Sequence, residues 1–196
     1  MYTLRSLFSF GHSPLSHYIG AASTALCIAL AALGNASAQT NSHTQIQALL
    51  QSGQAQQALV QAEQALEKTP RDPQLQFLKA NAEQALGQTE AADASLTALT
   101  QNFPELPEPW NNLAQLRAAQ GRLAEAQQLL EKALISNPQF AKAHANLAQV
   151  LLAQTIGHLE QAQQIAPNAQ QAAQIQALRA ASSAQASPAG EATIVN

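Results

Sequence analysis

Apolar and polar residues form short amphipathic stretches along most of the chain, and glycine and proline separate these stretches at a fixed interval. A glycine between two such stretches suits the left-handed turn that ends a helix, and a proline after the second stretch marks a place where a helix must stop. The columns that recur at one constant spacing are Gly53, Gly87 and Gly121; Ala58, Ala92 and Ala126; Ala65, Leu99 and Ala133; and Pro70, Pro104 and Pro138. Each unit of this period therefore predicts a helix, a tight turn, a second helix and a proline-marked turn.

The alanine columns have a packing role in this pattern. Ala58, Ala92 and Ala126 stand at the fourth place of each second stretch, where a small side chain lets two helix backbones approach closely. The residue seven positions later lies on the same helical face. The pattern thus predicts pairs of closely packed antiparallel helices.

The unit at residues 107–140 carries the clearest signature. Its matching residues are Trp110, Leu113, Ala114, Gly121, Leu123, Ala126, Leu130, Ala133, Leu134 and Pro138. This set resembles the tetratricopeptide repeat (TPR), although Arg117 stands where the family usually has an aromatic residue. The resemblance implies a right-handed all-α solenoid of about 3.5 repeats, with units at 39–72, 73–106, 107–140 and 141–167.

The last unit departs from the period. The interval from Pro138 to Pro167 is shorter than the period by five residues, and these are missing near Thr155, where the turn between the helices would stand. Two outcomes are open: one long helix over about 141–165, or a bend at Gly157. We favour the long helix because this segment has no strong turn residues. Residues 168–181 predict a closing helix, and residues 182–196 predict a disordered tail.

Residues 1–38 have the pattern of a secretory signal peptide. A start with Arg5 and no acidic residue leads into an apolar run over 19–33, and Ala36 and Ala38 provide the small residues that signal peptidase requires. We expect cleavage after Ala38 and release into a bacterial periplasm, with no membrane attachment afterwards. An uncleaved signal-anchor and a lipoprotein acylated at Cys27 are the alternatives.

Composition excludes several classes of function. The net charge is −3, which does not favour a nucleic-acid binder, and the single cysteine excludes an intrachain disulfide and a cysteine-ligated metal site. After residue 38 the only histidines are His43, His144 and His158, and no nucleophile elbow, phosphate-binding loop or paired-histidine motif is present. His144 occupies the place of the repeat tryptophan, where we expect it to pack against a neighbouring helix. We expect no catalytic residues, no cofactor and no metal.

The resemblance implies that the first helix of each repeat lines a concave groove that binds a protein partner. The lining positions form a polar, amide-rich surface, which suits a peptide segment. The expected partner-binding residues are Phe77, Asn81, Gln84, Asn111, Asn112, Gln115, Lys142, Ala145 and Gln149.

A narrower hypothesis concerns peptide carboxylates. Chaperone-binding members of the family hold a C-terminal carboxylate with five Lys, Asn and Arg residues. Asn81, Asn112 and Lys142 match three of these positions, whereas Phe77 and Asn146 stand where a lysine and an arginine would be.

The sequence therefore predicts a non-catalytic, exported interaction scaffold that binds a peptide segment or helix of an envelope protein. A self-assembling structural protein and a signal-anchored membrane adaptor are the alternatives.

Overall fold

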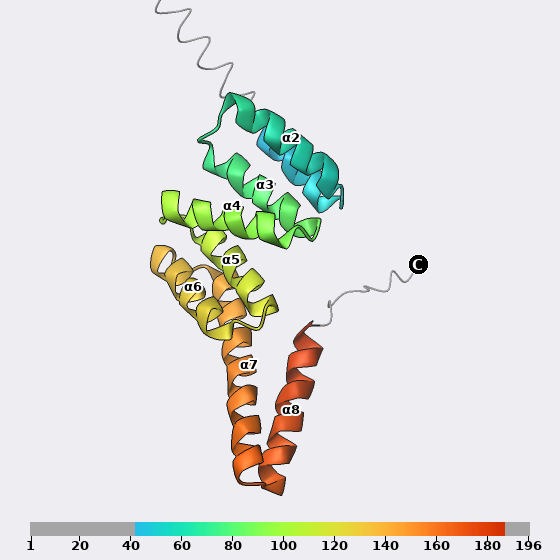
Figure 1. Ribbon diagram of the computed structural model, residues 1–196, viewed down its shortest axis with the longest axis vertical. Helices are drawn as coiled ribbons and strands as arrows, with labels where there is room; N and C mark the ends of the chain where they lie inside the picture. Colours follow the sequence, from blue (N-terminus) through green and yellow to red (C-terminus); the bar gives the residue numbers. More distant parts are fainter. Residues whose placement is uncertain (1–41, 187–196) are drawn as a thin grey trace, which may run out of the picture. The chain divides into compact units, whose positions relative to one another are not determined.

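The computed structural model describes residues 42–186, and these residues are helical apart from short connections (Figure 1). The chain divides into two units, residues 1–45 and residues 46–196, and all the labelled helices belong to the second. Residues 42–51 are helical and precede α2 (Ala55–Lys68), α3 (Pro73–Ala85), α4 (Thr89–Asn102), α5 (Pro107–Ala119), α6 (Leu123–Ser136), α7 (Ala141–Ile165) and α8 (Ala169–Ala186). The predicted signal peptide lies outside the described residues.

The three glycines of the sequence period end the first helix of each pair in the same way. Gly53, Gly87 and Gly121 have positive φ angles of 75°, 71° and 76°. At Gly87, the glycine N–H donates to Gln84 and the next N–H donates to Glu83, over 3.1 and 2.9 Å. These two bonds satisfy carbonyls that the helix end would otherwise leave unpaired. The backbone bonds repeat at the other two glycines, so each turn reverses the chain within about two residues.

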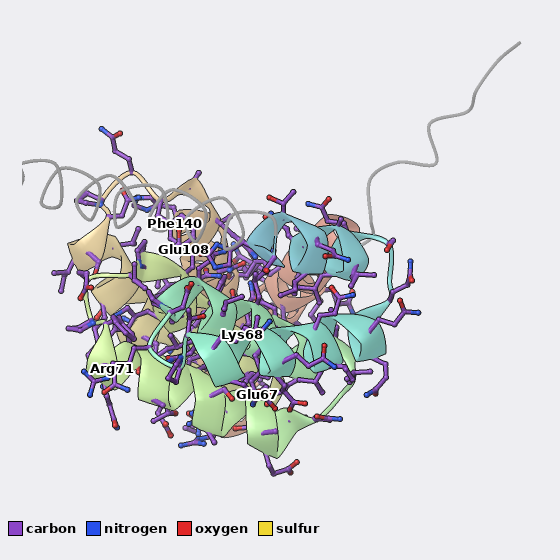
Figure 2. The ribbon with its side chains drawn as sticks, turned by 90° about the horizontal axis from the view of Figure 1, so that it is seen from above. Glu67, Lys68, Arg71, Glu108 and Phe140 are labelled. Atoms are coloured by element: carbon purple, nitrogen blue, oxygen red, sulfur yellow. The ribbon has the colours of Figure 1, made fainter. Side chains whose placement is uncertain are left out.

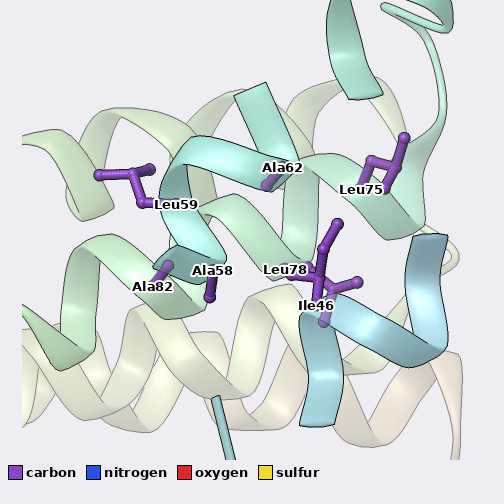
Figure 3. Close-up of a cluster of buried hydrophobic side chains, with 7 residues drawn as sticks. All are labelled: Ile46, Ala58, Leu59, Ala62, Leu75, Leu78 and Ala82. Atoms are coloured by element: carbon purple, nitrogen blue, oxygen red, sulfur yellow. The ribbon is translucent and has the colours of Figure 1, made fainter. Parts of the chain in front are cut away.

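Buried alanines hold the helix pairs together. Ala58, Ala92 and Ala126 each have an exposed fraction of 0%. Each belongs to a hydrophobic cluster that combines one helix pair with the first helix of the next pair. Figure 3 shows the first cluster: Ile46, Ala58, Leu59, Ala62, Leu75, Leu78 and Ala82. Because every cluster spans a repeat boundary, the core is continuous along the array.

Each helix packs against the next one in sequence, and α5 also contacts α7. Such nearest-neighbour packing is the basis of a repeat solenoid. Residues 42–186 form an all-α repeat solenoid, the fold that the resemblance to the tetratricopeptide repeat implies.

The helix α7 runs without a break through the position where a turn would stand. Thr155 occupies the column of the three turn glycines, one period after Gly121, and its hydroxyl donates to the Leu151 carbonyl over 2.8 Å. A β-branched residue strongly disfavours the left-handed conformation that the turn requires, so the two helices of this unit merge. The long-helix alternative is the one that the structure contains.

The helix α8 packs against α7, with Ile175 buried and with an ion pair between Arg179 and Glu160. It continues to Ala186, so residues 182–186 are helical. The prediction of a closing helix that ends at residue 181 and a disordered tail from residue 182 is wrong for these five residues, because Ser182 and Ser183 continue the helix rather than end it. Residues 187–196 lie outside the described part of the chain.

A second recurring contact joins the helix pairs through the proline turns. Trp110 Nε1 donates to the Pro104 carbonyl over 3.0 Å, and the same column places Gln76 Nε2 2.7 Å from the Pro70 carbonyl. His144 Nε2 lies 2.9 Å from the Pro138 carbonyl. We expected His144 to pack against a neighbouring helix; the structure instead leaves the residue exposed, with its ring in the polar contact of this column.

Arg117, the residue that replaces the usual aromatic, joins α5 to α4 by electrostatics. Its guanidinium forms two hydrogen bonds to the Asp93 carboxylate, one of them 2.8 Å long from Nη2. Both side chains are largely shielded from solvent, at 13% and 25% exposed. The Arg117 hydrogen bonds lower the pKa of Asp93 below its ordinary value, against the opposing effect of burial.

The glycine turns give the first prediction. A Cβ built on Gly121 or on Gly157 would meet no atom within 4 Å beyond the adjacent backbone, so both substitutions by alanine test backbone conformation alone. Gly121→Ala forces a side chain into the left-handed region and should destabilise the protein by about 1 kcal/mol. Gly157→Ala, inside α7, should stabilise it by about 0.5–1 kcal/mol. Urea unfolding followed by the fluorescence of Trp110, the only tryptophan, measures both. Equal effects of the two substitutions would contradict this account of the turns.

The Asp93–Arg117 pair predicts a pH dependence of stability. Because the folded-state pKa of Asp93 is lowered, its contribution is fully present above the unfolded pKa of about 3.9 and is lost as the pH falls through the folded value. Asp93→Asn should lower stability by about 1 kcal/mol at pH 7. This deficit should shrink below pH 4, which thermal melts of both proteins between pH 7 and 3 would show. A constant deficit across this range would mean that the charge of Asp93 is not what stabilises the contact.

Candidate functional site

The first helices of three successive units contribute to one surface cavity, which we call the polar pocket. It has a volume of about 540 Å³ and is lined by Phe77, Asn81, Gln84, Ala85, Glu108, Asn112, Gln115, Phe140 and Lys142. Of these, Glu108 and Phe140 are labelled in Figure 2. The lining comes from α3, α5 and the start of α7, so the sequence period places equivalent helix faces around one cavity. Six of the nine predicted partner-binding residues lie here: Phe77, Asn81, Gln84, Asn112, Gln115 and Lys142.

A chain of side-chain amides connects α7, α5 and α3. Asn146 Nδ2 donates to Asn111 Oδ1 over 2.7 Å, Asn111 Nδ2 donates to Asn112 Oδ1 over 3.1 Å, and Asn112 Nδ2 donates to Asn81 Oδ1 over 2.7 Å. We call these four residues the asparagine chain. Its two middle members each donate and accept, which satisfies polar groups that would be costly to bury unpaired. The asparagine chain therefore fixes the spacing of three first helices.

The burial of Asn111 corrects the sequence-based prediction for this residue. Its exposed fraction is 0%, so it lies beneath the groove surface and holds the asparagine chain together. Ala145 is exposed but lines neither of the two pockets described here. Helix periodicity places both residues on the inner side of their helices, but it does not show which of the adjacent amides faces the neighbouring helix.

A second cavity, which we call the apolar pocket, lies between α5, α6 and α7. It has a volume of about 310 Å³, and its lining residues are Ala114, Gln115, Ala118, Leu123, Leu130, Asn146, Gln149, Val150 and Ala153. Gln115 and Gln149 are the predicted binding residues found here, and Gln115 also lines the polar pocket. The sequence reasoning missed the apolar walls of this cavity, because alanine and leucine at these positions also fit an ordinary helix interface.

The charges of the polar pocket nearly balance. Glu108 and Lys142 both line it, and Lys142 makes no ion pair with any residue of 42–186.

Within residues 42–186, no three His, Cys, Asp or Glu side chains gather as metal ligands would. No helix in the described part of the chain has both the length and the apolar character needed to cross a membrane.

Comparison with known proteins points to one kind of repeat. A family described as tetratricopeptide repeat matches residues 117–181. A thermophilic TPR protein of Thermus thermophilus is 21% identical with a TM-score of 0.56, and the alignment covers 72% of this chain and 81% of that one. The first TPR domain of human RPAP3 is 18% identical with a TM-score of 0.54, covering 58% of this chain and 90% of that one. No curated protein matches the sequence.

Residues 117–181 match the tetratricopeptide repeat family, and the described helices share the fold of solved TPR structures. In this repeat array, α3–α4 and α5–α6 are complete helix pairs, and α7 starts a further unit whose two helices are fused. The polar pocket lies between the first helices of adjacent repeats, which is the face on which the sequence resemblance places the groove.

The repeat array brings together the three residues that match a carboxylate clamp, but it engages Asn112 and the amide oxygen of Asn81 in structural contacts. Asn81, Asn112 and Lys142 all line the polar pocket. Asn112 is 8% exposed, and both atoms of its amide already take part in the asparagine chain. Lys142 and the amide nitrogen of Asn81 are therefore the groups of this set that stay available to a ligand.

Proposed function

We propose that the protein is a non-catalytic, exported scaffold whose TPR groove binds a peptide segment or helix of an envelope protein. The observation that carries this proposal is the polar pocket, because first helices from three successive units line one cavity. Its amide groups can both donate and accept hydrogen bonds, which suits the polar backbone and side chains of another chain.

A structural neighbour supports a peptide as the ligand. The first TPR of Spaghetti (RPAP3), solved with the HSP90 peptide SRMEEVD, is 18% identical with a TM-score of 0.53, covering 58% of this chain and 90% of that one. A preformed solenoid surface also favours binding, since the receptor need not become ordered first. The absence of catalytic sequence motifs agrees with a role in binding rather than catalysis.

The proposal of export rests on the sequence of residues 1–38. The apolar run over 19–33 is shorter than the roughly 20 residues that span a bilayer as a helix, and small residues follow at Ala36 and Ala38. We therefore favour cleavage after Ala38 and a periplasmic location over a signal-anchored adaptor.

Photo-crosslinking from Gln115 tests the proposed groove. Gln115 is partly exposed and lines both pockets, whereas Gln128 is an exposed glutamine of α6 that lines neither. A photoreactive residue at position 115 of the full chain, in cells of its source organism, should give a defined crosslinked protein band that position 128 does not give. Equal patterns at the two positions would argue against a groove-bound partner.

The same recovered protein reports on export. Its intact mass should lack residues 1–38 and it should fractionate with the periplasm. Retention of residues 1–38 would favour the signal-anchored adaptor. A partner that proves to be a second copy of the chain would favour the self-assembling alternative.

A further inference from the structure

The side chains of α7 fall on three faces. One face packs against α5 and α6, with Ala143 and Val150 buried, and another packs against α8, with an ion pair from Glu160. The third face carries six exposed residues at alternating intervals of three and four, which we call the outer stripe: Ala148, Leu151, Thr155, His158, Ala162 and Ile165. This interval is that of a coiled-coil seam. The outer stripe contains no Asp, Glu, Lys or Arg, although it faces solvent along most of the helix.

The first half of the outer stripe is a packing face of the repeat. Ala148 stands in the column of Ala80 and Ala114, which are both completely buried. These two alanines belong to clusters that contain the second helix of their own units, α4 and α6. Ala148 is exposed because the second helix of its unit continues along α7 instead of folding back. Leu151, the next residue of the stripe, is 43% exposed for the same reason.

The second half of the outer stripe is the matching face. Ala162 stands five residues before Pro167, the place that Leu99 and Ala133 hold before the prolines of their units. Leu99 and Ala133 are completely buried, whereas Ala162 is exposed and Ile165 is 85% exposed. A continuous helix cannot bring its own two halves together. The helix α7 therefore carries both faces of a helix pair and cannot join them within one chain.

A second copy of α7 that runs antiparallel covers both faces at once. When Ala153 of the two helices lies at the same level, Ala148 stands opposite His158 of the second copy, and Leu151 stands opposite Thr155. Each pair sets a smaller side chain against a larger one, as knobs-into-holes packing requires. The same two contacts repeat on the other side of the two-fold axis, so the interface is self-complementary and closes as a dimer.

The charges of α7 favour the same orientation. Lys142 and Glu160 are the charged residues of this helix apart from its histidines. Antiparallel packing sets the Lys142 end of one helix beside the Glu160 end of the other, and it also opposes the two helix dipoles. Parallel packing would set each of these charges beside its own copy. The charge pattern therefore selects an antiparallel pair.

The length of α7 is sufficient for a stable contact. Its 25 residues make a helix about 37 Å long. A helix about 10–12 Å across has an accessible circumference of about 40–45 Å, so a partner that covers one third of it removes about 500 Å² from each copy. The total of about 1,000 Å² is the lower end of what a specific interface needs. We therefore expect a reversible dimer rather than a permanent one.

We propose that the outer stripe of α7 is a dimer interface, in which the α7 helices of two copies pack antiparallel and complete between two chains the helix pair that neither chain completes alone. This inference does not depend on the proposed function. No residue of the outer stripe lines the polar pocket or the apolar pocket. The dimer thus carries two open grooves, and one partner with two binding segments would gain avidity from it.

Sedimentation velocity of the full chain at about 1–100 μM tests the interface. The unchanged chain should show a monomer–dimer equilibrium. Leu151→Glu and Thr155→Glu should each raise the dissociation constant at least about tenfold, because the glutamates of the two copies meet near the two-fold axis. Gln164→Glu adds the same charge at an exposed position of α7 outside the stripe and should leave the equilibrium unchanged. Circular dichroism melts establish that all three variants fold.

Disulfide crosslinking tests the antiparallel register in a Cys27→Ser background, which removes the single natural cysteine. The double variant Ala148→Cys/His158→Cys should give a covalent dimer on mild oxidation, because these two positions face each other across the interface. Within one helix they lie about 15 Å apart, too far for a disulfide inside the chain. Ala148→Cys/Gln164→Cys is the matched control and should stay monomeric on a non-reducing gel.

Several outcomes would overturn the inference. These are a monomer at every concentration, a dimer that both stripe substitutions leave intact, equal crosslinking of the two double variants, and masses that keep growing with concentration. A dimer that forms only after deletion of residues 187–196 would show that the chain's own tail covers the stripe, and would overturn it as well. Loss of the crosslinked partner at Gln115 with the dimer retained would overturn the proposed function alone.

Discussion

The close approach of helix backbones at one alanine per repeat is the constraint on which the rest of the structure depends. Ala58, Ala92 and Ala126 are completely buried, each at the place where two helices of a pair and the first helix of the next pair meet. A larger side chain there would have to displace a helix, since protein interiors are close-packed. The alanines therefore set the helix spacing, and this spacing brings α3, α5 and α7 close enough to share the polar pocket and the asparagine chain.

The fused helix α7 changes what the last repeat does. Its first half contributes Lys142 to the polar pocket and Asn146, Gln149 and Val150 to the apolar pocket, as the first helix of a complete repeat would. Its second half does not return along the first but packs against α8. The repeat thus keeps the face that lines the two pockets, and the loss of the turn makes α7 and α8 the helix pair at the end of the array.

The period of the sequence predicts the helices well because glycine and proline have strong local conformational preferences. The long helix also follows from local chemistry, since Thr155 cannot easily take the place of a turn glycine. Side-chain partners across helices are less predictable. Asn111 and Asn112 are adjacent in sequence, yet burial of the first depends on its bonds to Asn146 and Asn112. Likewise Arg117 is visible as a departure from the repeat signature, but its partner Asp93 is set by how α4 and α5 pack.

The most direct test of this account compares two alanines of one helix. Ala126 is fully buried in α6, whereas Ala124, two residues earlier, is exposed. Urea unfolding of Ala126→Leu should show a loss of stability of about 1–3 kcal/mol, because the added side chain overpacks the contact between helices. Ala124→Leu should change stability by less than about 0.5 kcal/mol. Equal stabilities of the two variants would contradict the claim that the alanine contact sets the spacing of the array.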